Sequence, residues 1–278
     1  MVFADRTSPV SLDGGLEQVL LPHMPYCGHA PDERHGMKFA VIGGTGLIGS
    51  RVVKNLNAAG HEAVPHSKST GADVISGQGL DEAVAGADVV VNLTNSPTFD
   101  EASPAFFQTS MDNLLAAARK GGVGHFVILS IIGAEQVPEL DYYRAKVLQE
   151  NILAAGPIPY SIVRATQFMD FMDAVLSWTA DGDTVRLPAT PIQPIAAKDV
   201  ADAVAEVAAG APLNGIRNIA GPEIFSLDEL GRITLSRKGD GRTVVTDPTA
   251  GMFAVVKGDV LTDKDAHLAP THYTDWLS

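Results

Sequence analysis

Glycines cluster directly after an apolar run near position 40. Residues 39–42 are apolar throughout, and glycines occupy positions 43, 44, 46 and 49. This spacing fits G-x-G-x-x-G as well as G-x-x-G-x-x-G, patterns in which a strand turns tightly into a helix. Backbone without Cβ atoms lets a pyrophosphate approach, and the helix N-terminus favours the anion. The pattern therefore predicts a dinucleotide site at Gly43, Gly44, Thr45, Gly46, Leu47, Ile48 and Gly49.

A glycine turn can also close a strand without binding anything, so its context matters. After the turn, Ile48, Val52 and Leu56 recur at helical spacing, and Gly60 ends the pattern. Strand, turn and helix thus follow one another in the order that a nucleotide site requires. This order favours a binding site over a purely structural turn.

A tyrosine and a lysine four residues apart form the second reactive pattern. On a helix, Tyr142 and Lys146 would share one face. Such a pair also occurs by chance on exposed helices. Here it follows an apolar run that ends at Ser130, and parallel strands gather ligands at their carboxyl ends. Ser130, Tyr142 and Lys146 are therefore the candidate catalytic residues.

The elements that would position these residues alternate along the chain. Short apolar runs are separated by longer helical patterns, which indicates parallel strands joined by crossover helices. The expected strands are residues 38–42, 62–64, 73–75, 87–93, 125–130 and 160–164, and the expected helices include 104–120, 140–155 and 199–209. We predict an α/β fold with a doubly wound, Rossmann-like parallel sheet whose ligands bind at the carboxyl edge.

The two ends of the chain differ from this middle part. Residues 1–36 are rich in proline and lack a sustained apolar period, so we expect an irregular extension before a single domain of residues 37–278. The spacing of His23, Cys27, His29 and His35 fits no paired-ligand pattern, so we expect no metal site. From about residue 180 the pattern weakens, which suggests a small lobe that covers the site. Within it, residues 226–229 form a capping-box sequence before a helix.

Composition limits the kinds of partner. The net charge of −13 argues against nucleic acids and anionic membranes, and no apolar run reaches the roughly 18 residues of a membrane span. A single cysteine allows no internal disulfide and fits a reducing cytoplasm. We expect a cytoplasmic protein with a small-molecule substrate, and the sequence leaves a homo-oligomer open.

The segment roughly 20 residues beyond the glycines indicates which nicotinamide cofactor binds. Proteins that prefer NAD place an acid there, whereas this chain has Ser67 and Lys68. Hydroxyl and ammonium groups could hold a 2′-phosphate, so we predict NADPH over NADH. Asp73 is a candidate partner for the adenine amino group. Alternatively, Lys68 and Asp73 belong to an exposed polar loop.

Taken together, these motifs resemble the short-chain dehydrogenase/reductase superfamily, in particular its atypical, NmrA-like NAD(P)-binding branch. The resemblance covers about residues 37–210 and rests on residues 43–49, Ser130, the Tyr142-x-x-x-Lys146 pair and residues 164–168. It implies hydride transfer to a carbonyl or similar acceptor, with Tyr142 as proton donor. Lys146 would supply a positive charge and hold the nicotinamide ribose, and Ser130 would bind the substrate oxygen.

One departure from the superfamily concerns the helix before the serine strand. Many members have an asparagine there, and the corresponding residue here is Phe107. The NmrA-like branch also includes proteins that bind the cofactor and regulate partners without turnover, often without the tyrosine. Retention of Tyr142 favours an enzyme, and a non-catalytic redox sensor is the alternative.

Residues after the last predicted strand of the sheet are expected to border the substrate. Thr166, Gln167 and Phe168 are the candidates. Phe168, Met172 and Leu176 also recur at helical spacing, as they would on an ordinary core face. An apolar wall would suit a hydrophobic or aromatic carbonyl compound or a quinone, and we therefore expect a reductase of such compounds.

Overall fold

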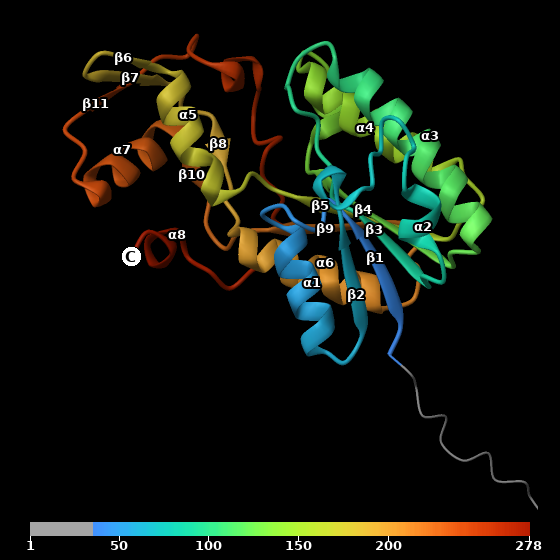
Figure 1. The fold of residues 1–278 in the computed structure, drawn as a ribbon. Coiled ribbons are helices and arrows are strands. Elements are labelled where there is room, and N and C mark those ends of the chain that lie inside the picture. Colours follow the sequence, from blue (N-terminus) through green and yellow to red (C-terminus); the bar gives the residue numbers. More distant parts are fainter. Residues whose placement is uncertain (1–35) are drawn as a thin grey trace, which may run out of the picture. The chain divides into compact units, whose positions relative to one another are not determined.

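A seven-stranded parallel sheet forms the centre of the computed structural model, which describes residues 36–278 (Figure 1). Its strand order is β12-β9-β5-β4-β3-β1-β2. The strands are β1 Lys38–Ile42, β2 Glu62–His66, β3 Val89–Asn92, β4 His125–Ile131, β5 Tyr160–Ala165, β9 Gly215–Ala220 and β12 His267–Leu268. His23, Cys27, His29 and His35 lie outside the described residues, so the expectation of no metal there stays a prediction.

Helices cover both faces of this sheet (Figure 1). Alternate residues of β1 show the division. Phe39 and Val41 pack with α1 (Gly49–Ala58) and α6 (Ala197–Ala209), whereas Ala40 and Ile42 pack with α2 (Leu80–Val84), α3 (Ser103–Gly121) and α4 (Asp141–Ala154). Strands covered on both sides need apolar residues throughout, and all of β3 is buried. The predicted doubly wound fold is confirmed.

The strand order reverses between β1 and its neighbours, because β2 lies on one side of β1 and β3 on the other. In such sheets ligands bind beyond the carboxyl ends of the strands, where connections leave in opposite directions. The glycine turn leaves β1 at this point, and Ser130 lies near the end of β4. The topology thus brings the two reactive patterns of the sequence to one edge.

A small C-terminal lobe packs around a core of its own, which includes Met172, Leu187, Leu230 and Tyr273. The lobe contains two small sheets, ordered β11-β7-β6 and β10-β8. Its elements are α5 Met172–Trp178, β6 Ala180–Asp181, β7 Thr184–Leu187, β8 Pro191–Ile192, β10 Phe225–Ser226, α7 Leu227–Lys238, β11 Thr243–Thr246 and α8 Tyr273–Trp276. Short 3₁₀ helices also occur at Lys68–Thr70, Ala134–Gln136, Met169–Phe171 and Met252–Val255.

The predicted strand at residues 73–75 is wrong. These residues form a turn in which the Asp73 carboxylate accepts a hydrogen bond from the N–H of Ile75. Gly77 donates its N–H to the carbonyl of Asp73 and has a φ of +78°. A short polar side chain that bonds its own backbone favours a turn over a strand. β2 is therefore the edge strand, and Asp73 stands in a turn.

Smaller differences concern element ends. β4 continues one residue past Ser130, and strands β9 and β12 were not expected from the sequence. Helix α7 begins at Leu227 after Ser226, but Ser226 forms no side-chain capping bond, so the predicted capping box is wrong while the helix is present. Within residues 36–278, no helix has both the length and the apolar character to cross a membrane.

Candidate functional site

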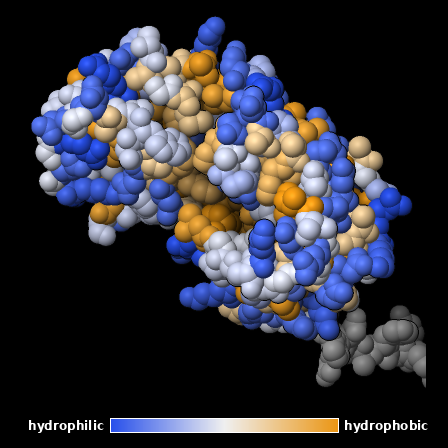
Figure 2. Space-filling model, turned by 45° about the horizontal axis from the view of Figure 1, so that its top comes forward, coloured by the Kyte–Doolittle hydropathy of each residue, from blue (hydrophilic) through white to orange (hydrophobic). Residues whose placement is uncertain are grey.

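One cavity of about 870 Å³ opens at the carboxyl edge of the sheet. Figure 2 shows a hollow with hydrophobic surface on this side of the molecule. The cavity is bordered by the glycine turn, the segment after β2, the loop between β3 and α3, the first turns of α4, and residues 165–168 after β5. Met252 and Phe253 of the C-terminal lobe complete the wall. The volume is in the range of small-molecule and cofactor sites.

The glycines of the turn serve two different needs. A Cβ atom on Gly44 would lie 2.6 Å from Val41 O, and one on Gly49 would lie 2.2 Å from Gly43 O. Both positions need glycine because the chain's own backbone is so close. A Cβ on Gly46 would meet only Gly43 O, at 3.3 Å, and Gly46 is exposed and borders the cavity. Open space around Gly46 suits the close approach of a ligand.

Backbone donors also face this region. Gly43 and Gly44 donate their N–H groups to the carbonyl of His66, which fastens the turn to β2. Among the described residues, the N–H groups of Leu47 and Ile48 donate no hydrogen bond. They lie at the start of α1, where the helix dipole favours an anion. The turn is thus chemically suited to a pyrophosphate.

The segment after β2 brings together the residues predicted to select the cofactor. Ser67, Lys68 and Asp73 all border the cavity. The Lys68 ammonium group lies 3.4 Å from Asp73 Oδ2 and is largely exposed. The pKa of Asp73 is lowered, mainly by the backbone hydrogen bond from Ile75. Desolvation opposes this shift, and the contact with Lys68 adds to it. The Ser67 hydroxyl lies 2.8 Å from that of Ser69.

Tyr142 and Lys146 both border the cavity from α4, as their spacing predicts. Lys146 is buried and donates hydrogen bonds to Leu129 O at 2.6 Å and to Gln149 Oε1. Burial lowers the pKa of Lys146 to about 7, although the carboxylate of Glu150 acts in the opposite direction. The ionisation of this lysine therefore falls close to neutral pH.

The phenol of Tyr142 donates a hydrogen bond to Asn95 Oδ1 at 2.5 Å. Burial raises the pKa of Tyr142 above its usual range. Phe107, which stands where many relatives have an asparagine, is fully buried, and its ring centre lies 4.7 Å from Lys146 Nζ. The same ring is 6.1 Å from that of Tyr142. Phe107 therefore packs against the pair and offers it no hydrogen bond.

Within residues 36–278, three buried side-chain atoms of residues that border the cavity have no hydrogen-bond partner. They are Ser130 Oγ, Thr166 Oγ1 and Gln167 Oε1. Ser130 and Thr166 are nearly inaccessible to solvent. Because a buried polar group without a partner costs free energy, such groups in native proteins usually have a functional reason. Their shared position suits a polar part of a ligand.

The aromatic and methionine residues after β5 divide between core and cavity. Phe168 borders the cavity and also packs against the core under α6. Met172 and Leu176 belong to the buried core of the C-terminal lobe and do not border the cavity. Of the three residues at helical spacing, Phe168 alone faces the candidate site.

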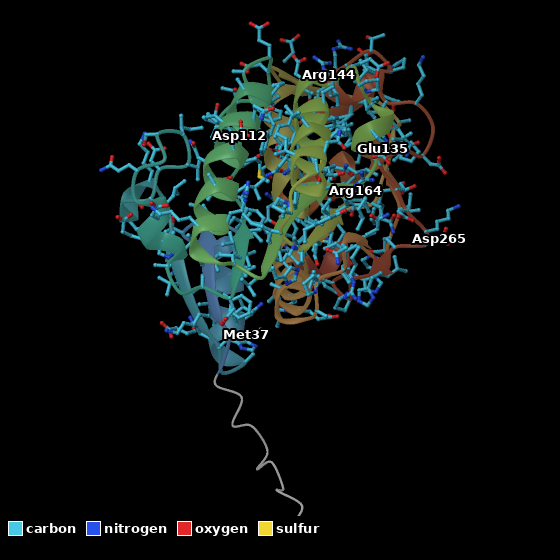
Figure 3. All side chains as sticks on the ribbon, turned by 90° about the vertical axis from the view of Figure 1, so that its right-hand side faces the viewer. Met37, Asp112, Glu135, Arg144, Arg164 and Asp265 are labelled. Atoms are coloured by element: carbon cyan, nitrogen blue, oxygen red, sulfur yellow. The ribbon has the colours of Figure 1, made fainter. Side chains whose placement is uncertain are left out.

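Arg164 begins the last motif of the resemblance, but it does not border the cavity. Its guanidinium group forms ion pairs with Glu150 at 2.7 Å and with Glu135 at 3.0 Å, and Figure 3 shows Arg164 and Glu135 near each other. Arg164 therefore connects α4 and the preceding loop to β5, and it lies outside the wall of the cavity.

The loop between β3 and α3 belongs to the site, although no sequence motif indicated it. Asn95 and Phe99 of this loop border the cavity, and both contact Tyr142. One signal was present, because polar residues follow the buried strand β3 at the edge where ligands bind. No pattern of spacing, however, indicates which side chain of a loop turns inward.

The protein family described as NAD(P)H-binding matches residues 43–210 of the chain. Three curated proteins are similar to this chain in sequence. The photosystem II assembly factor Ycf39 of Synechocystis is 27% identical over 150 residues, which cover 48% of this chain and 45% of that protein. The (4-alkanoyl-5-oxo-2,5-dihydrofuran-3-yl)methyl phosphate reductase of Streptomyces griseus is 30% identical over 152 residues, 50% of this chain and 49% of that protein.

The third relative is the chloroplastic divinyl chlorophyllide a 8-vinyl-reductase of Cucumis sativus. It is 26% identical over 219 residues, which cover 66% of this chain and 52% of that protein. The chain spans about half the length of the curated relatives it matches. Among solved structures, a nucleoside-diphosphate-sugar epimerase from Staphylococcus aureus superposes with a TM-score of 0.64 at 16% identity, covering 87% of this chain and 99% of that one. This likeness concerns the fold.

Proposed function

Since the chain belongs to the NAD(P)H-binding family, we propose that it is an NADPH-dependent oxidoreductase that reduces a small, hydrophobic carbonyl or quinone compound. One observation carries the proposal: the glycine turn, Ser130, Tyr142 and Lys146 border the same cavity. A binding turn for the coenzyme and a phenol with an ammonium group beside it are what this chemistry requires. Two of the three curated relatives are named as reductases, which supports the reaction class.

The cofactor would lie along the glycine turn. Gly46 leaves room for the pyrophosphate, and the N–H groups of Leu47 and Ile48 would donate to it. Ser67 and Lys68 would hold the 2′-phosphate of NADPH, and Asp73 would accept from the adenine amino group. When bound, the dinucleotide supplies a hydride. The buried Lys146 would hold the ribose next to the nicotinamide.

The side chains around Tyr142 would complete the reduction. Tyr142 would give its proton to the substrate oxygen as negative charge develops there, and Ser130 would donate a hydrogen bond to the same oxygen. Ser130 Oγ has no partner among the described residues, so that bond is available. A phenol with a raised pKa still protonates an alkoxide readily. Near neutral pH, however, little of it is ionised, so little phenolate is present to act as the base of the reverse reaction.

The walls of the cavity favour an apolar substrate with a polar edge. Phe99, Phe168 and Phe171 supply aromatic surface. Thr166 and Gln167 supply polar atoms that have no hydrogen-bond partner in the described part of the chain. Aromatic rings favour flat, apolar molecules, and the polar atoms would fix their orientation. These features support the proposed class of hydrophobic carbonyl and quinone substrates.

A second candidate function is a nicotinamide-binding redox sensor that acts through protein contacts. The similarity to Ycf39, which is named as an assembly factor, favours it. The test is NADPH oxidation by the wild-type chain against a panel of aromatic aldehydes, ketones and quinones. Turnover by the wild type and its loss in Tyr142→Phe would support the reductase. A protein that binds NADPH but oxidises none with any compound of the panel would support the sensor.

A further inference from the structure

We propose that Asn95 is a positioning residue for Tyr142, holding its hydroxyl group before proton transfer and stabilising its phenolate after it. The inference rests on the proposed function. Asn95 stands in the loop between β3 and α3, outside the motifs that identify the family by sequence. It would make this loop, together with β4 and α4, a third part of the reducing site.

The contact itself is short and direct. Tyr142 Oη donates to Asn95 Oδ1 at 2.5 Å, and this is the hydrogen bond that the phenol forms within residues 36–278. The two residues are far apart in the sequence but meet at the cavity that both border. Lys146, one helical turn from Tyr142, directs hydrogen bonds to Leu129 O and Gln149 instead. The hydroxyl of Tyr142 is therefore oriented by Asn95.

Apolar neighbours on the other sides leave this role to Asn95. The Phe99 ring packs edge-on against that of Tyr142 with 4.8 Å between centres, and Phe107 lies 6.1 Å away. Phenylalanine has no polar group, so neither ring can accept a strong hydrogen bond from the phenol or donate one to a phenolate. A phenol in such surroundings would rotate among weaker contacts if the amide were absent.

The chemistry of an amide suits both states of the phenol. Before the reaction the Asn95 carbonyl oxygen accepts the phenol hydrogen. With the cofactor bound, the hydride that it supplies would add to the substrate carbon and leave NADP+, while the electron pair of the C=O bond would move to oxygen. The Tyr142 hydroxyl would then break its hydrogen bond to Asn95 and turn toward the substrate. Tyr142 Oη would give its proton to the substrate oxygen and become a phenolate, which would later regain a proton from water. An amide that turns over can donate its NH₂ group to the phenolate, because asparagine carries both a donor and an acceptor.

Two substitutions separate this role from a merely structural one. Asn95→Asp keeps the shape and the acceptor oxygen, but it places a negative charge beside the phenolate. Asn95→Leu keeps the approximate size and removes both polar groups. If Asn95 serves both states, Asp should be the more damaging variant, because like charges oppose ionisation of the phenol. If Asn95 only maintains the shape of the loop and accepts one hydrogen bond, Asn95→Asp should be less damaging than Asn95→Leu.

The experiment measures kcat, KM and the NADPH dissociation constant at pH 8 for the full chain. We expect kcat to fall about tenfold or more in Asn95→Asp, and less in Asn95→Leu, with KM and the dissociation constant within about twofold of wild type.

Thr98→Val is the matched control, because Thr98 forms a side-chain hydrogen bond to Asp100 in the same loop and does not border the cavity. It should behave as wild type. Near-wild-type kcat in Asn95→Asp, or a smaller loss there than in Asn95→Leu, would overturn the proposal.

A spectroscopic arm keeps this test distinct from the test of the proposed function. The Raman doublet of tyrosine reports whether a phenol donates a hydrogen bond, and the difference between wild type and Tyr142→Phe isolates Tyr142. Its signal should show a strong donor in wild type and Asn95→Asp, and a weaker donor in Asn95→Leu. An unchanged signal in Asn95→Leu would overturn the contact, even if the wild type turned over no compound of the panel.

Discussion

Lys68 and Asp73 form an ion pair beside the cavity, with 3.4 Å between Nζ and Oδ2. The sequence assigned them separate tasks, the 2′-phosphate for Lys68 and the adenine amino group for Asp73. Their contact means that the carboxylate offsets part of the positive charge that a phosphate would meet. The proposed preference for NADPH therefore depends on the balance between these two residues.

This balance gives the first prediction. Lys68→Ala should weaken NADPH binding about tenfold and leave NADH binding unchanged, because only NADPH carries the 2′-phosphate. Asp73→Asn should strengthen NADPH binding by releasing Lys68, and added salt should reduce both effects. Titration of both cofactors by fluorescence measures the constants. Equal loss of NADPH and NADH affinity in Lys68→Ala would contradict the assignment.

The second prediction separates glycines that bind ligand from glycines that the fold needs. Gly46→Ala should raise the dissociation constant of NADPH about tenfold or more with little change in Tm, because a Cβ there meets only Gly43 O at 3.3 Å. Gly49→Ala should lower the free energy of unfolding by about 1–3 kcal/mol, because its Cβ would lie 2.2 Å from the same oxygen. Calorimetry of each variant, with and without NADPH, compares the two. An unchanged free energy of unfolding in Gly49→Ala would contradict the requirement for glycine at this position.

The third prediction concerns the pH dependence that follows from Lys146. Burial lowers the pKa of its ammonium group to about 7, so the positive charge is present below that pH and is lost above it. If reduction needs the charge, kcat/KM should fall as the pH rises through about 7. Lys146→Arg should be less active but should not show this fall, because guanidinium stays protonated. A flat wild-type profile from pH 6 to 9 would argue against a role for the charge.

The fourth prediction concerns the aromatic wall. Phe99 contacts Tyr142 and also packs against Phe171 and Trp178, each with 6.2 Å between ring centres. Phe99→Leu should raise KM for aromatic substrates roughly 2- to 10-fold, with a smaller change for aliphatic ones. Comparing matched pairs of aromatic and aliphatic carbonyl compounds measures the difference. A uniform change across both groups would mean that Phe99 supports the loop and does not contact substrate.

Local patterns account for the parts of the site that the sequence predicted. The glycine turn, the helical spacing of Tyr142 and Lys146, and Ser130 near a strand end each follow from residue type and position. Because parallel strands share one carboxyl edge, the fold class alone implied that these residues would meet. Their convergence on one cavity agrees with that expectation.

The parts that the sequence did not predict depend on contacts between distant residues. Val74 and its neighbours resemble a strand, but the Asp73 side chain closes a turn there. Strand β9 was missed because four of its six residues are not buried, so it lacks the continuous apolar run of a central strand. Asn95 and Phe99 contact Tyr142, which comes from a different element. Such pairings arise only once the chain has folded.

The reductase proposal is tested most directly by measuring the oxidation of NADPH by wild type and by Tyr142→Phe in parallel, with cofactor binding measured for both. We expect wild type to turn over at least one aromatic carbonyl or quinone compound. We further expect Tyr142→Phe to lower kcat by about 10²- to 10⁴-fold, while its NADPH dissociation constant stays within about twofold of wild type. Unchanged turnover in Tyr142→Phe would contradict the role of the phenol as proton donor.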